Sequence, residues 1–154
     1  MPSVQRYRSG RIAEVKTLVR AGVTASVGDL VCVATAGHVD NYSSSGLTPA
    51  TFRTAFLGVL AQGATKGNET TDSPALVYTF CEAEFPLNVA AAAALDPGGL
   101  VAAAGDQTVS TGAVLGAAGT GTAIGRLARP VLVGDTTALV RIESVLFGGP
   151  QPLT

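Results

Sequence analysis

The chain has 154 residues, of which 47% are hydrophobic and 14% are charged, and its formal net charge is −1. That length fits one domain with a substantial core, and the apolar content excludes a wholly disordered chain. A nearly neutral chain lacks the excess of Lys and Arg that neutralises phosphates, so we expect no nucleic-acid partner. The apolar stretches are too short to span a bilayer, so we expect no membrane partner and no secretion signal.

Most of the chain is predicted to form β-strands. Its apolar runs are short, rich in Val, Thr and Ile, and bounded by Gly, Pro, Asn, Asp or Ser, which is typical of strands. Ala90–Ala94 has high helix propensity and is followed by Pro97 and Gly98, which predicts at most one short helix. Loops are expected at Asp40–Pro49, Gly63–Pro74 and Gly105–Thr122, and strands at Ile12–Val19, Asp29–Ala34, Phe56–Gln62, Leu76–Phe85, Gly99–Ala103, Ala123–Ala128 and Ala138–Phe147.

An internal repeat is the most informative pattern in the sequence. Three strand motifs occur twice in the same order, and the spacing between the copies falls from 70 to 67 to 63 residues, as shorter loops in the second half would produce. The pattern predicts two related β-units. The matching motifs are Gly28–Val31 with Gly98–Val101, Leu57–Leu60 with Ile124–Leu127, and Ala75–Val77 with Ala138–Val140.

Each predicted unit contains three strands, which have one apolar face and cannot stand alone in water. Two such units can close over each other. The sequence therefore predicts an all-β fold, a compact β-barrel or sandwich of two pseudo-repeated three-stranded units with extended terminal arms. We expect an N-terminal arm and first strand over 1–22, one β domain over 23–147 with repeats at about 23–88 and 89–147, and a C-terminal tail over 148–154.

Basic side chains are concentrated at the N-terminus. Residues 1–20 hold five basic side chains and one acidic one, whereas acidic residues dominate from 21 to 106. A basic segment on an acidic body suggests an arm that docks on an acidic surface, for example on a neighbouring copy. A frayed, solvated terminus is the alternative.

Residues that could carry catalysis are few. His38 is the single histidine and lies two residues before Asp40, but no nucleophile elbow accompanies this pair. Glu82 and Glu84 share a face of a predicted strand, where a solvated polar edge is the simpler interpretation. We therefore expect no enzymatic activity, no cofactor, and no catalytic, cofactor-binding or metal-binding residue.

Two other features also favour a non-catalytic protein. Cys32 and Cys81 lie in apolar runs and are expected to be buried thiols. The Gly-rich stretch Gly116–Gly125 lacks the Gly-Lys-Ser/Thr sequence of a phosphate loop, so we expect a flexible contact loop. A chain low in charge suits an assembly component whose surface is covered by copies or partners.

The order of the strand motifs resembles that of tailed-bacteriophage capsid cement proteins, also called head decoration proteins. The resemblance extends over roughly residues 23–145. It implies a small β-barrel-like protein that binds the outside of an expanded icosahedral head, often as a trimer, and reinforces the shell. The stretches that carry it are Val27–Val31, Leu57–Leu60, Ala75–Tyr78, Gly98–Val101, Ile124–Leu127 and Ala138–Ile142.

The resemblance also implies partners and a location. The partners are the major capsid protein and other copies of this chain in a homotrimer, and the location is the capsid exterior of a virion, after synthesis in the host cytoplasm. Two alternatives remain, namely another virion subunit, such as a head-fibre base or tail-tube-like protein, and a small ligand-binding β-barrel that uses His38 and Asp40. The candidate contact residues lie in the terminal segments and are Arg6, Tyr7, Arg8, Arg11, Phe147 and Pro150.

Overall fold

The computed structural model describes residues 13–34, 37–63, 65–66, 73–115, 121–147 and 149–150 of the chain. Strands dominate these residues, as the sequence predicts, and short helices complete them. The helices are α1 (Tyr42–Ser45), α2 (Pro49–Ala55) and a 3-10 helix (Val145–Phe147). The strands are β1 (Ala13–Val19), β2 (Thr24–Ala25), β3 (Leu30–Val33), β4 (His38–Asn41), β5 (Phe56–Gln62), β6 (Thr65–Lys66), β7 (Ser73–Pro86), β8 (Leu100–Ala103), β9 (Val109–Thr111), β10 (Ala123–Leu127) and β11 (Thr137–Glu143).

Nine of the described strands belong to one sheet, and five of them pair in a closed ring. The order is β1-β4-β3-β5-β7, and β1 also pairs with β7, which returns the ring to its start. β1 and β4 are parallel, whereas the other neighbours in the ring are antiparallel. Strands β2 and β6 form a separate antiparallel pair.

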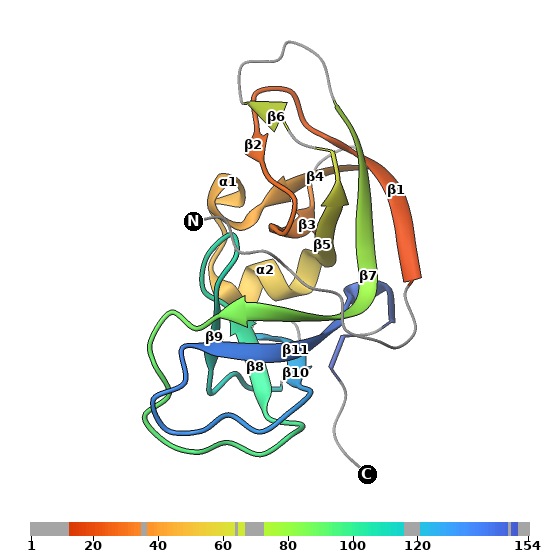
Figure 1. Ribbon diagram of the computed structural model, residues 1–154. Helices are drawn as coiled ribbons and strands as arrows, with labels where there is room; N and C mark the ends of the chain where they lie inside the picture. Colours follow the sequence, from red (N-terminus) through yellow and green to blue (C-terminus); the bar gives the residue numbers. More distant parts are fainter. Residues whose placement is uncertain are drawn as a thin grey trace.

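The other strands of the sheet pair in a second series. β7 pairs with β11, β11 with β10, β10 with β8, and β8 with β9, all in antiparallel orientation. A parallel bridge joins Leu87, directly after β7, to Val109 of β9 and so connects the two ends of this series. Figure 1 shows the two groups of strands as an N-terminal lobe (residues 13–79, top) and a C-terminal lobe (residues 80–143, bottom).

Strand β7 has 14 residues and belongs to both lobes. Its N-terminal half pairs with β1 and β5, and its C-terminal half, from Phe80 to Pro86, pairs with β11. In Figure 1 it runs down one side of the N-terminal lobe and bends into the C-terminal lobe. The odd-numbered side chains from Ala75 to Phe85 are buried, and the even-numbered ones between them are partly exposed. One face of this strand therefore lines the core along its whole length.

The buried apolar side chains form two clusters. The smaller cluster lies in the N-terminal lobe and includes Val31 and Val77. The larger cluster fills the C-terminal lobe and extends into the N-terminal lobe, where it includes Phe52 of α2 and Phe56 of β5. The Phe52 ring lies 4.9 Å from that of Tyr42 and 5.8 Å from that of Phe56, measured between centroids. Helix α2 thus packs an aromatic cluster between the two groups of strands.

The number of helices differs from the prediction of at most one. Both α1 and α2 overlap or follow the segment Asp40–Pro49, which was expected to be a loop. Helix α2 begins with Thr48 as N-cap, whose side chain accepts a hydrogen bond from the Thr51 amide, and with Pro49 in its first turn. This order of residues favours a helix start, and burial of Phe52 stabilises the short helix that follows.

No helix forms at Ala90–Ala94, where the sequence allows one short turn or helix. The Ala91 amide donates to Asp135 O at 2.9 Å, and the Gly134 amide donates to Ala91 O at 2.8 Å. Hydrogen bonds to a neighbouring loop therefore take the place of helical ones, and they override the propensity of the alanines.

Three expected boundaries also change. The last strand ends at Glu143 rather than Phe147, because the chain turns at the buried Ser144 into the 3-10 helix. The segment Gly105–Thr122, expected to be a loop, contains β9, and the segment Gly63–Pro74 contains β6 and the start of β7. Short strands of two or three residues are too brief to give an alternating pattern in the sequence.

A polar network joins the turn between β8 and β9 to the N-terminal lobe. The Asp106 carboxylate accepts hydrogen bonds from the Ser43 amide and hydroxyl, both at 2.7 Å. Gln107 Nε2 donates to Asp29 Oδ1 at 2.9 Å, and Asn41 Nδ2 donates to Asp29 Oδ2 at 2.9 Å. Because Asp29 and Asn41 are buried, the network helps to fix the orientation of the two lobes.

Candidate interaction surface

The most exposed large apolar side chains of the described residues lie on two loops of the C-terminal lobe. Val89 is 71% exposed, Val133 68% and Leu132 63%. Exposed alanines surround Val89 in the first of these loops. We call the exposed apolar residues of the two loops the apolar rim: Val89, Ala90, Ala92, Ala93, Ala94, Leu132 and Val133.

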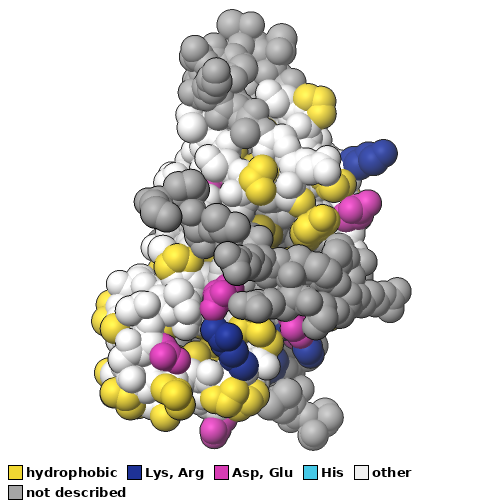
Figure 2. Space-filling model, viewed as in Figure 1, with side chains coloured by type: hydrophobic (Ala, Val, Ile, Leu, Met, Phe, Trp, Pro, Cys, Tyr) yellow, Lys and Arg dark blue, Asp and Glu magenta, His cyan; other side chains and the backbone are white. Residues whose placement is uncertain are grey.

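The apolar rim occupies one edge of the molecule. Figure 2 shows hydrophobic side chains gathered along the lower edge of the C-terminal lobe, where the two loops run in Figure 1. Large contiguous apolar patches are uncommon on soluble monomers and often coincide with interaction sites, which makes the rim a candidate interaction surface. Val27, another exposed valine, belongs to the N-terminal lobe, where its carbonyl oxygen accepts a hydrogen bond from Gln107 Nε2.

Backbone hydrogen bonds hold the two loops of the rim together. Leu95 and Val131 exchange both of their backbone hydrogen bonds, at 2.8 and 3.0 Å. Ala91 contacts Asp135 and Gly134 through the two hydrogen bonds described above. The rim is therefore a preformed surface, and little ordering entropy opposes its binding to a partner.

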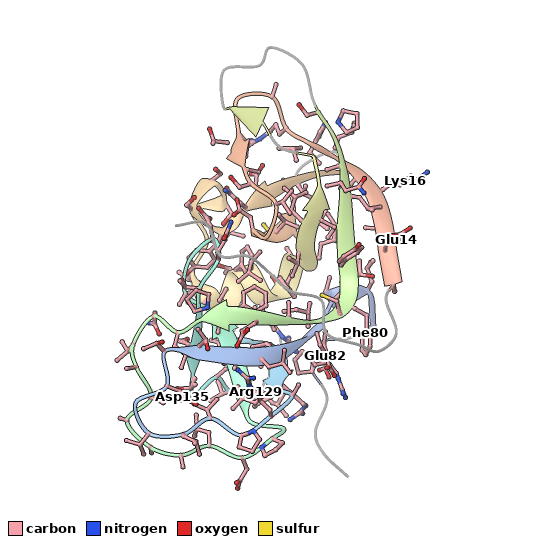
Figure 3. All side chains as sticks on the ribbon, viewed as in Figure 1. Glu14, Lys16, Phe80, Glu82, Arg129 and Asp135 are labelled. Carbon is pink, nitrogen blue, oxygen red and sulfur yellow. The ribbon has the colours of Figure 1, made fainter. Side chains whose placement is uncertain are left out.

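Charged groups near the rim have partners of their own. The Asp135 carboxylate accepts a hydrogen bond from the Leu132 amide at 2.9 Å. Arg129 Nη2 lies 2.6 Å from Glu84 Oε1, and Figure 3 labels Arg129 and Asp135 in the C-terminal lobe. The centre of the rim is thus apolar, with charges near its border.

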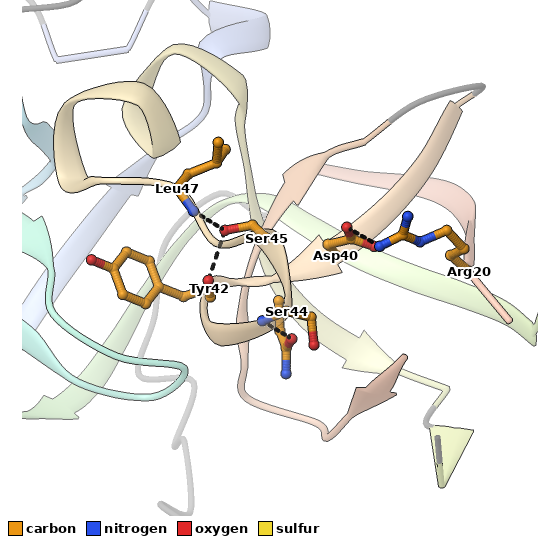
Figure 4. Close-up of polar contacts among 7 residues, drawn as sticks. Arg20, Asp40, Tyr42, Ser44, Ser45 and Leu47 are labelled. Carbon is orange, nitrogen blue, oxygen red and sulfur yellow. Dashed lines mark hydrogen bonds and ion pairs between the residues drawn. The ribbon is translucent and has the colours of Figure 1, made fainter. Parts of the chain in front are cut away.

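A polar cavity of about 370 Å³ is the second feature with functional potential, and it lies in the N-terminal lobe. Arg20, Cys32, Asp40, Ser44 and Ser45 contribute polar groups to its lining. Arg20 Nη2 contacts Asp40 Oδ2 at 2.7 Å, and Figure 4 shows this ion pair beside α1. Asp40 is only 5% exposed, and its second oxygen, Oδ1, is buried with no hydrogen-bond partner among the described residues.

Helix α1 positions the two serines of this cavity. The Ser44 amide donates to the side chain of Asn41, which caps the helix. The Ser45 hydroxyl donates to Tyr42 O at 2.7 Å and accepts from the Leu47 amide at 3.2 Å, so its orientation is fixed (Figure 4).

The terminal residues proposed from the sequence are placed only in part. Arg6, Tyr7, Arg8 and Arg11 lie outside the described residues, as does the stretch 116–120 of the Gly-rich segment. Phe147 ends the 3-10 helix, and its side chain is not among those described. Pro150 is buried against its own chain. These placements leave the contact roles of the terminal segments as predictions.

The carboxylates considered for catalysis have structural partners. Glu82 Oε1 accepts two hydrogen bonds from Arg141, the shorter at 2.7 Å, and Glu84 pairs with Arg129. Asp40, which lies near His38 in the sequence and for which no catalytic role is expected, forms an ion pair with Arg20. These carboxylates therefore act as ion-pair partners in the structure.

Both cysteines are free, buried thiols. Burial raises the pKa of Cys32 to about 11, and the nearby Asp40 carboxylate adds to the effect. Burial raises the pKa of Cys81 to about 12, with a further contribution from Glu82. Both side chains thus stay protonated at neutral pH and are poor nucleophiles.

The described residues contain no group of three or more His, Cys, Asp or Glu side chains placed to hold a metal ion. None of the helices in this part of the chain combines the length and apolar character needed to cross a membrane. Comparison with protein-family models finds no match to the sequence, and comparison with curated proteins finds none either.

Sequence reasoning missed the apolar rim as a surface. The apolar character of Val89–Ala94 was visible, but it was interpreted as a possible helix. Leu132 and Val133 precede Gly134, and a pair of large apolar residues next to a turn glycine was the available signal. That the two segments are neighbours follows from tertiary contacts, namely the pairing of Leu95 with Val131 and the hydrogen bonds of Ala91.

Proposed function

We propose that the chain consists of two related five-stranded β-barrels fused through β7. The first support is that strands pair in equivalent register in the two lobes. Val31 lies opposite Gly58 in the N-terminal lobe, and Val101 lies opposite Gly125 in the C-terminal lobe. These positions differ by 70 and 67 residues, which are the spacings of the repeated sequence motifs.

The other antiparallel pairings keep the same correspondence. The pairs formed by β3 with β4 and by β5 with β7 have counterparts in β8 with β9 and in β10 with β11. Matched pairs are Val31–Asn41 with Val101–Thr111, Val33–Val39 with Ala103–Val109, and Leu60–Val77 with Leu127–Val140.

The two halves of β7 complete the comparison. In the N-terminal lobe, β1 pairs with the first half of β7; in the C-terminal lobe, the second half of β7 takes the place of β1 and pairs with β11. The parallel pairing of β1 with β4 likewise has its counterpart in the parallel bridge from Leu87 to Val109 of β9. Each copy then holds five strands rather than three, and the boundary falls inside β7 rather than near residue 88. Matched pairs are Val15–Val77 with Ala83–Val140, and Val19–Val39 with Leu87–Val109.

For the function, we propose a structural virion protein that binds the outer surface of an expanded phage head and stabilises it. The apolar rim carries this proposal, because clustered exposed apolar side chains are suited to burial against a partner. Under the proposed repeat, the part of the sequence that corresponds to Leu132–Val133 falls in residues 63–72, which read Gly-Ala-Thr-Lys-Gly-Asn-Glu-Thr-Thr-Asp. This sequence is polar, so the repeated unit itself does not require apolar residues at that place.

The proposed mechanism is thermodynamic. A protein that binds the expanded shell and not its precursor stabilises the expanded state by mass action. The rim supplies the contact with the major capsid protein, and a homotrimer that touches several capsid subunits gains avidity from its linked sites. In this proposal, the basic N-terminal segment with Arg6, Tyr7, Arg8 and Arg11 reaches a neighbouring subunit, and Phe147 lies at the other terminal contact. Pro150 is buried in its own chain and takes no part in that contact.

Co-sedimentation with expanded, undecorated phage heads tests the proposal. The wild-type chain is expected to pellet with the heads. Val133→Asp places a charge in the centre of the rim, and desolvation of that charge is expected to weaken binding at least about tenfold. The matched control is Val27→Asp, which changes a valine of 53% exposure in the N-terminal lobe and is expected to bind as the wild type does.

Two results would overturn the proposal. If the wild-type chain stays in the supernatant at every concentration, it does not bind the head. If both variants bind like the wild type, the rim is not the contact surface. Circular dichroism of the two variants keeps loss of binding separate from loss of folding.

A further inference from the structure

The cavity beside Asp40 contains an ion pair with uncommitted hydrogen-bonding groups. The structure records a single contact between the two side chains, Arg20 Nη2 to Asp40 Oδ2 at 2.7 Å. Asp40 Oδ1 is buried without a donor, and a buried unpaired carboxylate oxygen costs free energy. The Arg20 side chain is 48% exposed, so the pair has one buried and one accessible member.

Comparison with the C-terminal lobe indicates that the barrel does not require these groups. In the N-terminal lobe, Asp40 lies opposite Cys32. Under the proposed repeat, the corresponding pair in the C-terminal lobe is Ser110 opposite Ala102. Val19 corresponds to Leu87, because each makes a parallel pairing with the equivalent strand of its lobe. Arg20, the next residue after Val19, therefore corresponds to Asn88, the next residue after Leu87. The acid, the base and the thiol therefore occur in one copy only.

Apolar groups complete the wall of the same cavity. Val33, Ala34 and Leu47 line it, and Val33 and Leu47 are 42% and 37% exposed. A volume of about 370 Å³ lies within the range of small-molecule sites. The cavity thus offers an acidic group next to a basic group, with an aliphatic wall at its side.

We propose that this cavity binds a small zwitterion, an α-amino acid with an aliphatic side chain. Its ammonium group donates to Asp40 Oδ1, and its carboxylate accepts from Arg20 and from the Ser44 hydroxyl. The aliphatic side chain packs on Val33 and Leu47. The exposed guanidinium of Arg20 moves to admit the ammonium and keeps its charge beside the ligand carboxylate.

Backbone amide shifts measured by NMR during titration test the proposal with three probes of matched shape. L-leucine carries both charged groups, 3-methylbutylamine lacks the carboxylate, and 4-methylpentanoate lacks the ammonium. We expect a Kd of about 1 mM for L-leucine, so a concentration of about 10 mM should nearly saturate the site. The amide shifts are expected in Cys32–Ala34 and Asp40–Leu47. Each partial probe is expected to bind at least about tenfold more weakly, because one charge-assisted contact is lost.

Variants locate the binding at the ion pair. Asp40→Asn and Arg20→Gln are each expected to weaken L-leucine binding at least about tenfold. Arg129→Gln is the matched control, because Arg129 forms an ion pair of similar length and exposure with Glu84 in the other lobe. It is expected to bind L-leucine as the wild type does.

The proposal fails if L-leucine produces no saturable shift, if the three probes bind alike, or if both Asp40→Asn and Arg20→Gln bind like the wild type. It is independent of the proposed role on phage heads. Val133→Asp is expected to leave L-leucine binding unchanged, and Arg20→Gln is expected to leave head binding unchanged. The two proposals can therefore fail separately.

Discussion

At the scale of single residues, burial controls the chemistry of the two cysteines. Cys32 is 1% exposed and Cys81 3%, and the pKa of each thiol is raised, to about 11 and about 12. Below pH 9 nearly all of both thiols are protonated, and the thiolate is the reactive form. We expect no reaction of either thiol with a disulfide reagent in the folded protein at pH 8, and complete reaction after unfolding. Reaction of the folded protein at the rate of a free thiol would contradict this.

Glu143 is a residue whose charge is unfavourable in the fold. Burial raises the pKa of its carboxyl, against the opposing effect of Arg126 and Arg141, and Oε2 is buried without a partner among the described residues. The folded state therefore holds the proton to higher pH than the unfolded state. The free energy of unfolding therefore falls as pH rises from the pKa of Glu143 in the unfolded chain to its higher pKa in the folded protein. Above the folded pKa, the whole cost of the buried negative charge is present.

Glu143→Gln removes this penalty. We expect the variant to be more stable than the wild type at pH 7, as measured by urea unfolding. Its advantage should disappear as pH falls below about 4, where the carboxyl is protonated in both states. A variant that is less stable at pH 7, or whose advantage does not change with pH, would contradict the interpretation.

At the scale of strands, two equivalent glycines allow close contact between neighbours. A Cβ atom at Gly58 would meet Tyr78 O, and one at Gly125 would meet Arg141 O, both backbone oxygens that cannot easily move. We expect Gly58→Ala and Gly125→Ala each to lower the free energy of unfolding by about 2 kcal/mol or more. At Gly112 a Cβ would meet open space, so the cost in Gly112→Ala is the backbone strain of a positive φ, about 1 kcal/mol.

Differential scanning calorimetry of these three variants checks the prediction. The larger loss should occur at both strand glycines and to a similar extent, because their surroundings correspond. If only one of the two variants loses stability, the backbone around the other glycine is able to move away from the added methyl group.

Helix α2 depends on its N-cap residue, Thr48. The Thr48 side chain accepts the Thr51 amide, and the helix carries the buried Phe52 into the larger core cluster. We expect Thr48→Ala to cost about 1 kcal/mol of stability, and Thr48→Ser to cost much less because it keeps the oxygen. Equal losses in urea unfolding of the two variants would show that packing of the methyl group, rather than the cap, is what matters.

The sequence predicted the longer strands and missed the elements that depend on tertiary contacts. The alternation along Leu76–Phe85 and the run Phe56–Gln62 were enough to place β7 and β5. The short strand β9 gives no pattern of its own, and it forms because β8 lies beside it. The helix expected at Ala90–Ala94 failed for a related reason, since the Leu95–Val131 bridge brings a second loop alongside.

The candidate surfaces were harder to anticipate than the fold. Val89 and Val133 are exposed because the core lies on the other side of their loops. In a sequence this rich in apolar residues, exposed and buried valines cannot be told apart. The Arg20–Asp40 pair joins residues 20 apart, and β1 and β4 meet only through their parallel pairing. From the sequence, Asp40 can be related only to residues near it in the chain, such as His38. Its ion pair with Arg20 depends on the fold.

At the scale of the whole molecule, the two lobes carry different candidate sites. The C-terminal lobe carries the apolar rim, and the N-terminal lobe carries the polar cavity. The lobes share β7, and the network of Asp106 and Gln107 with Asp29 ties them together.

The most direct test of the central claim is the melting temperature of expanded, undecorated heads, measured by calorimetry with and without the protein. The account predicts that the wild-type chain raises this temperature in a saturable way and that Val27→Asp does the same, whereas Val133→Asp raises it little at equal concentration. An unchanged melting temperature with the wild-type chain present in excess would contradict the account.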